Sequence, residues 1–268
     1  MGATYPAGVT NIYGETLALT TALASLGMPG IETKQAIVYD PSVDFRLHIN
    51  PAIKAIYFYE ASASAGSRFT DLTRALTDRS ATGSGTTLDS RQAGDRLYVC
   101  CSDIVGGLRI DMTASTNGEN SVLTLNYWDG DSWEDTGETD LTVTSGKSLA
   151  KTGSITFSDP GDWVSAHLGG GNVDYVTGGG TPIPGMLITD TDAPGVYGFW
   201  LQFTWTLIFD VDTEIANIWT LNKNTDRGYF RAGQEYFLRF DRRATGAIEA
   251  LTAAGSDTLQ ITWLRTVI

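Results

Sequence analysis

The acidic and aromatic residues around Trp133 come nearest, by type and spacing, to a chemical site. Asp129, Asp131 and Asp135 begin like a calcium-binding loop. However, Trp133 occupies the fifth position of that loop, and Glu134 stands where glycine is needed. Paired carboxylates also serve as acid and base in glycoside hydrolysis, but these all lie in one turn that water surrounds. We therefore interpret the segment as a hydrated turn, with no metal ligand and no catalytic residue.

His48 and His167 are the only histidines in the chain. Neither is spaced with cysteine or carboxylate as a tetrahedral metal site requires, and no G-x-S-x-G motif provides a serine nucleophile. The glycine runs at 169–171 and 178–180 lack the Lys-Ser/Thr and the helix that follow a phosphate-binding loop. We predict that the protein is not an enzyme and needs no cofactor.

Three aromatic residues, Tyr127, Trp128 and Trp133, flank one predicted hairpin. Exposed aromatic faces stack on sugar rings, while nearby carboxylates and amides bond the hydroxyl groups, so these residues are candidates for a glycan platform. Alternate residues of a sandwich strand also place aromatic rings directly in the core. We favour the core interpretation and keep the platform as the alternative.

The strands that would position these residues show a period of two. Residues 123–128 alternate Leu, Leu and Tyr with Thr, Asn and Trp, which is typical of a strand with two different faces. Asp-Gly at 129–130 suits a tight hairpin turn, and a second short strand begins at Trp133. Ile155 and Phe157 mark a further strand before Trp163. We predict a β-meander over residues 123–163, and a longer buried strand over residues 197–209.

The composition favours a folded, mainly β protein. The chain has 268 residues, 42% of them hydrophobic, which is enough for one large or two smaller cores. Thirty glycines, ten phenylalanines and eleven tyrosines favour strands and turns over helices. No apolar run approaches about 18 residues, and Met1 is not followed by a secretion signal. We expect no interaction with membranes.

The net charge of −13 and the pI of about 4.4 describe a strongly acidic chain. Such a charge repels phosphate backbones, so we expect no binding to nucleic acid. Ordinary solubility explains the charge equally well.

Cys100 and Cys101 are adjacent and are the only cysteines. In a strand their side chains point to opposite faces, so a disulfide between them would need a strained turn. We predict two reduced thiols that behave as small hydrophobic residues in a protein assembled in a cytosol.

The chain divides into three predicted parts: 1–55, 56–221 and 222–268. Regular strand signals fill residues 56–221, which we predict to form a jelly-roll-like antiparallel β-sandwich. Residues 1–55 are irregular, with repeated prolines, and Glu15–Leu26 has the spacing of one short helix. We interpret residues 1–55 as an extended N-terminal arm that lies against a neighbouring subunit, or alternatively packs on its own sandwich. Its apolar interface candidates are Tyr5, Ile12, Tyr13, Leu19 and Leu23.

Residues 222–268 form a predicted C-terminal β extension, with strand candidates at 236–240, 247–251 and 258–267. The extension either completes the sandwich or forms a small second domain. Arg239, Arg242 and Arg243 make the densest positive site of the acidic chain. An arginine fork can pair with carboxylates of a neighbouring subunit, although charge that protects a strand edge is the equal alternative.

Several of these motifs together resemble a known module. They are similar to a β-sandwich of tailed-bacteriophage virion proteins. The similar features are, in chain order, a strand that ends in an aromatic pair, the turn D-G-x-S-W, the segments G-S-I-T-F and P-x-D-W, and the aromatic strand at 197–203. The similarity covers roughly residues 56–221.

The resemblance implies a structural protein of the virion, assembled in the host cytoplasm. We expect a capsid decoration or cement protein that binds the major capsid protein and copies of itself in many places, as a homo-oligomer with a trimer favoured. The alternative is a tail or baseplate module that binds host-surface glycan through Tyr127, Trp128 and Trp133.

Overall fold

Strands dominate the chain in a computed structural model, which describes residues 9–19, 24–27, 33–39, 42–43, 45–64, 67–77, 86–89, 91–168, 196–221, 228–230, 236–239, 247–252 and 257–266. The one helix among the described residues, α1, covers only Thr73–Thr77. The strand pairs there are all antiparallel. The prediction of a mainly β protein with antiparallel sheets is therefore confirmed.

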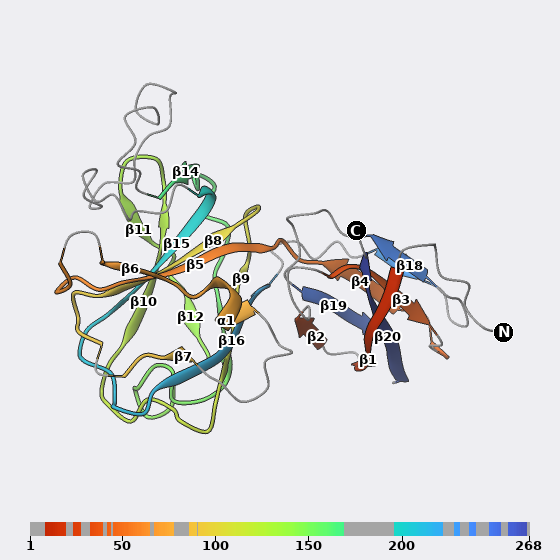
Figure 1. The fold of residues 1–268 in the computed structure, drawn as a ribbon, viewed down its shortest axis with the longest axis horizontal. Helices are drawn as coiled ribbons and strands as arrows, with labels where there is room; N and C mark the ends of the chain where they lie inside the picture. The colour runs from red at the N-terminus through yellow and green to blue at the C-terminus, as the bar shows by residue number, and fades with distance from the viewer. Residues whose placement is uncertain are drawn as a thin grey trace.

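Two sheets built from the middle of the chain form a sandwich, which we call the central sandwich (Figure 1, left). The seven-stranded sheet has the order β11-β10-β15-β8-β5-β6, with β14 also paired to β15. Its strands are β5 (Ile53–Tyr59), β6 (Phe69–Asp71), β8 (Arg96–Cys101), β10 (Leu123–Trp128), β11 (Trp133–Asp135), β14 (Ser165–His167) and β15 (Tyr197–Trp205).

The five-stranded sheet has the order β12-β13-β9-β16-β7. Its strands are β7 (Thr86–Thr87), β9 (Gly107–Met112), β12 (Thr139–Asp140), β13 (Gly153–Thr156) and β16 (Glu214–Leu221). The strand orders of the two sheets agree with a β-sandwich, while the jelly-roll connectivity remains a prediction.

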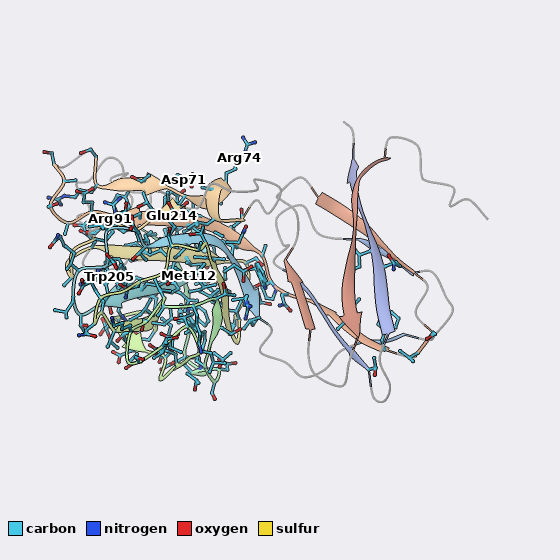
Figure 2. The ribbon with its side chains drawn as sticks, turned by 90° about the horizontal axis from the view of Figure 1, so that it is seen from below. Asp71, Arg74, Arg91, Met112, Trp205 and Glu214 are labelled. Atoms are coloured by element: carbon cyan, nitrogen blue, oxygen red, sulfur yellow. The ribbon has the colours of Figure 1, made fainter. Side chains whose placement is uncertain are left out.

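The main core lies between these two sheets. Leu125 and Phe203 enter it from the seven-stranded sheet, and Ile110 and Ile218 enter it from the five-stranded sheet, all nearly inaccessible to solvent. Figure 2 labels Trp205 and Met112 among the side chains of this body. Alternation along β10 explains the packing, because Leu123, Leu125 and Tyr127 share one face.

The two cysteines lie on opposite faces of β8, as predicted. Cys101 belongs to the main core, whereas Cys100 packs on the outer face of the seven-stranded sheet beside Trp128 and Trp200. Both are free and fully buried. Burial raises the pKa of the Cys100 thiol from 9.0 to about 12, and that of the Cys101 thiol well above 9.0.

The free energy of unfolding should therefore decrease as the pH rises above about 9. Above this pH the thiols ionise in the unfolded chain but stay protonated in the folded one, which favours unfolding by up to about 1.4 kcal/mol per pH unit for each thiol. This stabilisation is complete below pH 9 and is lost as the pH rises toward the folded-state pKa. Urea unfolding between roughly pH 8 and pH 10.5 measures the effect. The double variant Cys100→Ala, Cys101→Ala should show a flatter dependence, and an equal slope in both proteins would contradict the prediction.

The first and last strands of the chain build a separate body, which we call the terminal lobe (Figure 1). Its two four-stranded sheets have the orders β1-β20-β3-β18 and β17-β4-β19-β2. The strands are β1 (Val9–Leu19), β2 (Ala24–Gly27), β3 (Thr33–Tyr39), β4 (Phe45–Ile49), β17 (Gly228–Phe230), β18 (Tyr236–Arg239), β19 (Ala247–Thr252) and β20 (Asp257–Thr266). The predicted arm and C-terminal extension are thus two halves of one β structure. The three C-terminal strand predictions agree with β18, β19 and β20.

The predicted helix over Glu15–Leu26 is wrong. Residues 9–19 form β1, which pairs with β20 from Val9 opposite Thr266 to Leu19 opposite Asp257, and residues 24–27 form β2. The leucine spacing fits one side of a helix, but a long pairing with a strand more than 200 residues away overrides a local preference of this size.

Candidate functional site

The aromatic residues of the predicted glycan platform do not lie together on one exposed surface. Tyr127 is in the main core, 7% exposed, and its hydroxyl donates a hydrogen bond of 2.8 Å to Oδ1 of Asp162. This hydrogen bond raises the pKa of Tyr127 to about 12. Trp128 is on the opposite face of β10 and is also buried, and only Trp133 is partly exposed. The core interpretation therefore holds for Tyr127 and Trp128.

Hydrogen bonds between the Asp129 side chain and nearby backbone N–H groups hold the acidic hairpin around Trp133 in shape. Asp129 Oδ1 accepts hydrogen bonds of 2.7 Å from the N–H groups of both Asp131 and Ser132, and such bonds lower the pKa of the Asp129 carboxyl. Within the described ranges, no group of three or more His, Cys, Asp and Glu side chains could hold a metal ion. The turn thus uses Asp129 to close itself.

All eight predicted interface residues lie either in strands of the terminal lobe or outside the described residues. Ile12, Tyr13 and Leu19 belong to β1, and Arg239 belongs to β18, where it is opposite Gln35 of β3. The positions outside the described ranges are Tyr5, Leu23, Arg242 and Arg243. Whether any of these residues contacts another subunit stays a prediction.

One end of the central sandwich carries exposed apolar side chains. Val122, Leu207, Ile208 and Val211 are 46%, 52%, 42% and 62% exposed. We call these four residues the apolar loop end. Hydrogen bonds join its two segments, because Thr206 N–H donates to the Val122 carbonyl at 3.0 Å and the Ser121 hydroxyl donates to the Leu207 carbonyl at 2.7 Å.

A buried amide, Asn117, anchors the apolar loop end from beneath. Its side-chain NH₂ donates to the carbonyls of Ser148 and Glu119 at 2.9 and 3.1 Å. Its Oδ1 accepts from the N–H groups of Glu119 and Asp210 at 3.0 and 3.3 Å. Phe209, 1% exposed, inserts into the core between the exposed residues. The loop end is therefore fixed to the sandwich although its apolar side chains face solvent.

Sequence reasoning assigned Leu207 and Ile208 to a buried strand over 197–209, and this part of the prediction is wrong. The strand β15 ends at Trp205, and the next residues turn outward. Asp210 and Asp212 directly after this run are the signal of a bend that could have revealed the shorter strand.

A second candidate surface is the outer face of the seven-stranded sheet, opposite the main core. Strand register places Asn126 opposite Gln202, Gln202 opposite Tyr98, and Tyr98 opposite Tyr57. Asp135 and Asp71 continue the row at its two ends. Six neighbouring strands thus contribute to one line of hydrogen-bonding side chains, which we call the polar row: Asp135, Asn126, Gln202, Tyr98, Tyr57 and Asp71.

Hydrogen bonds connect the centre of the polar row. Asn126 Nδ2 donates to Gln202 Oε1 at 3.3 Å, and Gln202 Nε2 donates to the Tyr98 hydroxyl at 3.2 Å. Gln202 and Tyr98 are 8% and 4% exposed, and burial raises the pKa of Tyr98 to about 12. The phenol therefore stays protonated over the physiological range.

Aromatic rings surround the polar row. The Trp133 ring lies 5.7 Å from the Tyr98 ring and 5.6 Å from the Trp128 ring. On the other side, Tyr59 and Phe69 pack at 5.1 Å. Among these rings, Trp133, Tyr59 and Phe69 remain partly exposed, as does Tyr57 of the polar row. The face thus combines accessible rings with amide and hydroxyl groups.

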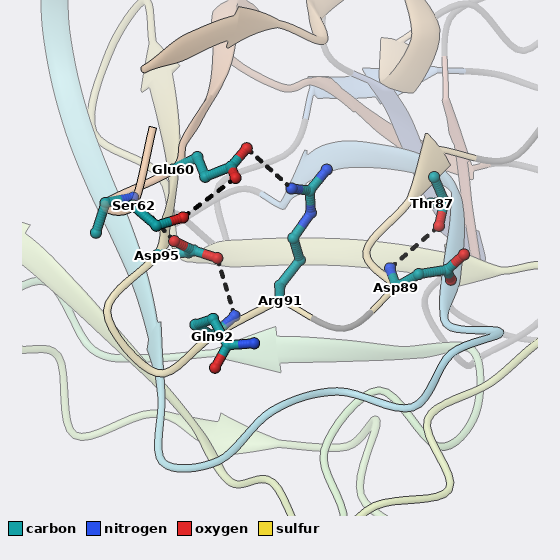
Figure 3. A network of polar contacts seen from close by, with 8 residues as sticks. Glu60, Ser62, Thr87, Asp89, Arg91, Gln92 and Asp95 are labelled. Carbon is teal, nitrogen blue, oxygen red and sulfur yellow. Dashed lines mark hydrogen bonds and ion pairs between the residues drawn. The ribbon is translucent and has the colours of Figure 1, made fainter. Parts of the chain in front are cut away.

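Arg91 belongs to a polar network that is structural (Figure 3). Its guanidinium is 4.2 Å from the centre of the Phe58 ring and 3.4 Å from Oε2 of Glu60. The buried Asp95 carboxylate accepts the N–H groups of Ala61 and Gln92, each at 2.9 Å. These contacts tie the loop before β8 to the end of β5, so we assign the network to loop positioning.

The chain matches no protein-family model, and no curated protein or solved structure is significantly similar to it. In the described part of the chain, no helix is long and apolar enough to cross a membrane.

Proposed function

We propose that the chain is a structural protein of a tailed-phage virion, which decorates and reinforces the capsid by binding in many copies. The apolar loop end carries this proposal. Val122, Leu207, Ile208 and Val211 are exposed on loops that the Asn117 hydrogen bonds hold in place. Exposed apolar groups on an ordered surface favour protein–protein contact, because association removes them from water without ordering a loop.

The proposed partners are the major capsid protein and further copies of this chain, with a trimer favoured. Weak contacts repeated over a shell add to a firm attachment, so each copy needs only a small apolar anchor. The resemblance of the motifs in residues 56–221 to phage virion sandwiches supports the same assignment. The place of action would be the virion, after assembly in the host cytoplasm.

A double variant, Leu207→Ser with Ile208→Ser, should bind particles assembled without this chain at least roughly tenfold more weakly than the wild type. Both side chains are exposed, so the fold should be retained. Cosedimentation of the purified protein with the particles measures the binding. The matched control is Val164→Ser, because Val164 is 44% exposed and its N–H donates to the carbonyl of Trp128, at the opposite end of β10 from Val122.

Unchanged binding of the double variant would contradict the role of the apolar loop end. Quantitative mass spectrometry of purified particles tests the location separately. An abundance comparable with that of the major capsid protein supports decoration of the shell, whereas a few copies per particle would place the chain in the tail.

A further inference from the structure

The outer face of the seven-stranded sheet combines partly exposed aromatic rings with hydrogen-bonding side chains. The capsid contact proposed for the apolar loop end uses none of these residues. We propose that this face binds a neutral glycan, with sugar rings stacked on Trp133 and Tyr59 and hydroxyl groups bonded to the polar row. This site lies on β-strands and not on the loop end, so it is independent of the capsid contact proposed above.

Stacking requires aromatic rings that keep one side accessible. Trp133, Tyr57 and Tyr59 are each partly exposed on this face, while the rings beneath them are buried. Pyranose C–H groups pack on such ring faces, and the strand register places these rings on the same face of the sheet. Neighbouring strands are about 4.8 Å apart, so the side chains of the polar row repeat on the scale of one sugar unit.

The polar row provides donors and acceptors already in place. Asn126 is partly exposed, and its amide is oriented by the 3.3 Å hydrogen bond to Gln202, which in turn is held by Tyr98. Because Gln202 and Tyr98 are buried, they form the floor, and the ligand meets Asn126 and the Tyr57 hydroxyl. Groups held before binding lose little conformational entropy when the ligand arrives.

The charges on this face select a neutral ligand. Asp135 and Asp71 are exposed at the two ends of the row, and the chain as a whole carries −13. The guanidinium of Arg96, whose charge acts on Tyr98 of the polar row, already donates to the carbonyls of Ala93 and Asp95 at 2.8 and 2.7 Å. Anionic polysaccharide would therefore meet repulsion, whereas carboxylates accept hydrogen bonds from neutral sugar hydroxyls.

Affinity electrophoresis of the full chain through gels that contain neutral polysaccharides, namely dextran, mannan or β-glucan, tests the proposal, with hyaluronan as the anionic comparison. We expect retardation by at least one neutral polymer and none by hyaluronan. Trp133→Ala should weaken the binding at least roughly tenfold, and Tyr57→Phe, which removes only a hydroxyl, should weaken it less. Leu141→Ser is the control, because Leu141 is 54% exposed and directly follows β12 of the five-stranded sheet, outside both proposed sites.

The conservative Tyr57→Phe variant keeps the test decisive if Trp133→Ala fails to fold. The proposal is overturned if the wild type is not retarded by any of the neutral polymers, or if it binds equally well after both substitutions. It is also overturned if Trp133→Ala leaves glycan binding intact but changes the oligomeric state in sedimentation velocity, because the face would then be a protein interface. None of these outcomes bears on the particle binding of the Leu207→Ser, Ile208→Ser variant.

Discussion

Replacing Trp200 by alanine should lower the free energy of unfolding by about 3–5 kcal/mol. Trp200 is fully buried in β15, which pairs with β8, β10 and β14. Its indole N–H donates to the Ala166 carbonyl at 2.9 Å, and its ring lies 6.4 Å from that of Tyr57. The substitution removes this packing from the seven-stranded sheet and also removes the buried hydrogen bond to the Ala166 carbonyl. Urea unfolding followed by far-UV circular dichroism measures the change.

Two further variants serve as comparisons for Trp200→Ala. Trp200→Phe keeps a ring but lacks the donor, so its effect should be intermediate. Val211→Ala removes apolar atoms from a side chain that is 62% exposed and should stay within about 0.5 kcal/mol of the wild type. A loss below about 1 kcal/mol for Trp200→Ala would mean that the outer face of the sheet does not stabilise the sandwich as described.

Asn117→Ala should destabilise the protein by about 3–4 kcal/mol and also weaken particle binding. The amide makes four hydrogen bonds, to Ser148, to Asp210 and, with both its ends, to Glu119. Removal leaves the buried Ser148 carbonyl and the part-buried backbone groups of Glu119 and Asp210 without this partner, and each such group costs about 1–3 kcal/mol when water cannot replace the bond. The backbone at Asp210 also loses a constraint beside Val211, so the apolar loop end should become mobile.

Thermal unfolding and hydrogen exchange of the amides around residue 210 measure the two parts of this prediction. The control is Asn120→Ala, because Asn120 is exposed and close in sequence. A variant that unfolds like the wild type, with unchanged exchange at residues 206–211, would show that water replaces the Asn117 amide.

Local sequence patterns predicted several strands of the central sandwich, but they did not predict which side chains of these strands are buried by residues from neighbouring strands. The period of two in residues 123–128 correctly predicted β10, with Leu125 and Tyr127 on one face. The same pattern left Trp128 open to either a core or a platform role. It is buried because neighbouring strands place Trp200, Cys100 and Trp133 around it, and this arrangement depends on residues distant in sequence.

The polar row could not be predicted from the sequence, because it too depends on the pairing of strands that are distant in the chain. Asn126, Gln202 and Tyr98 look like ordinary alternate residues within their own strands. Only the register of β10 with β15 and of β15 with β8 aligns them. A shift of one residue would move each side chain to the other face of the sheet, so no local pattern predicts the alignment.

The amino-acid sequence alone was sufficient for the β class, for the strands β10, β11 and β13 and for the opposite orientations of Cys100 and Cys101, because these follow from alternation and turn residues within a few positions. The prediction of one continuous meander over residues 123–163 is wrong, because β11 belongs to the seven-stranded sheet and β12 to the five-stranded sheet. The tertiary structure decided which segments pair. It joined β1 to β20 in the terminal lobe, ended β15 before Leu207, and aligned the polar row. Pairing between distant strands depends on the burial and hydrogen bonding of the whole sheet. A short stretch of sequence determines only a small part of this free energy, so it does not predict the pairing.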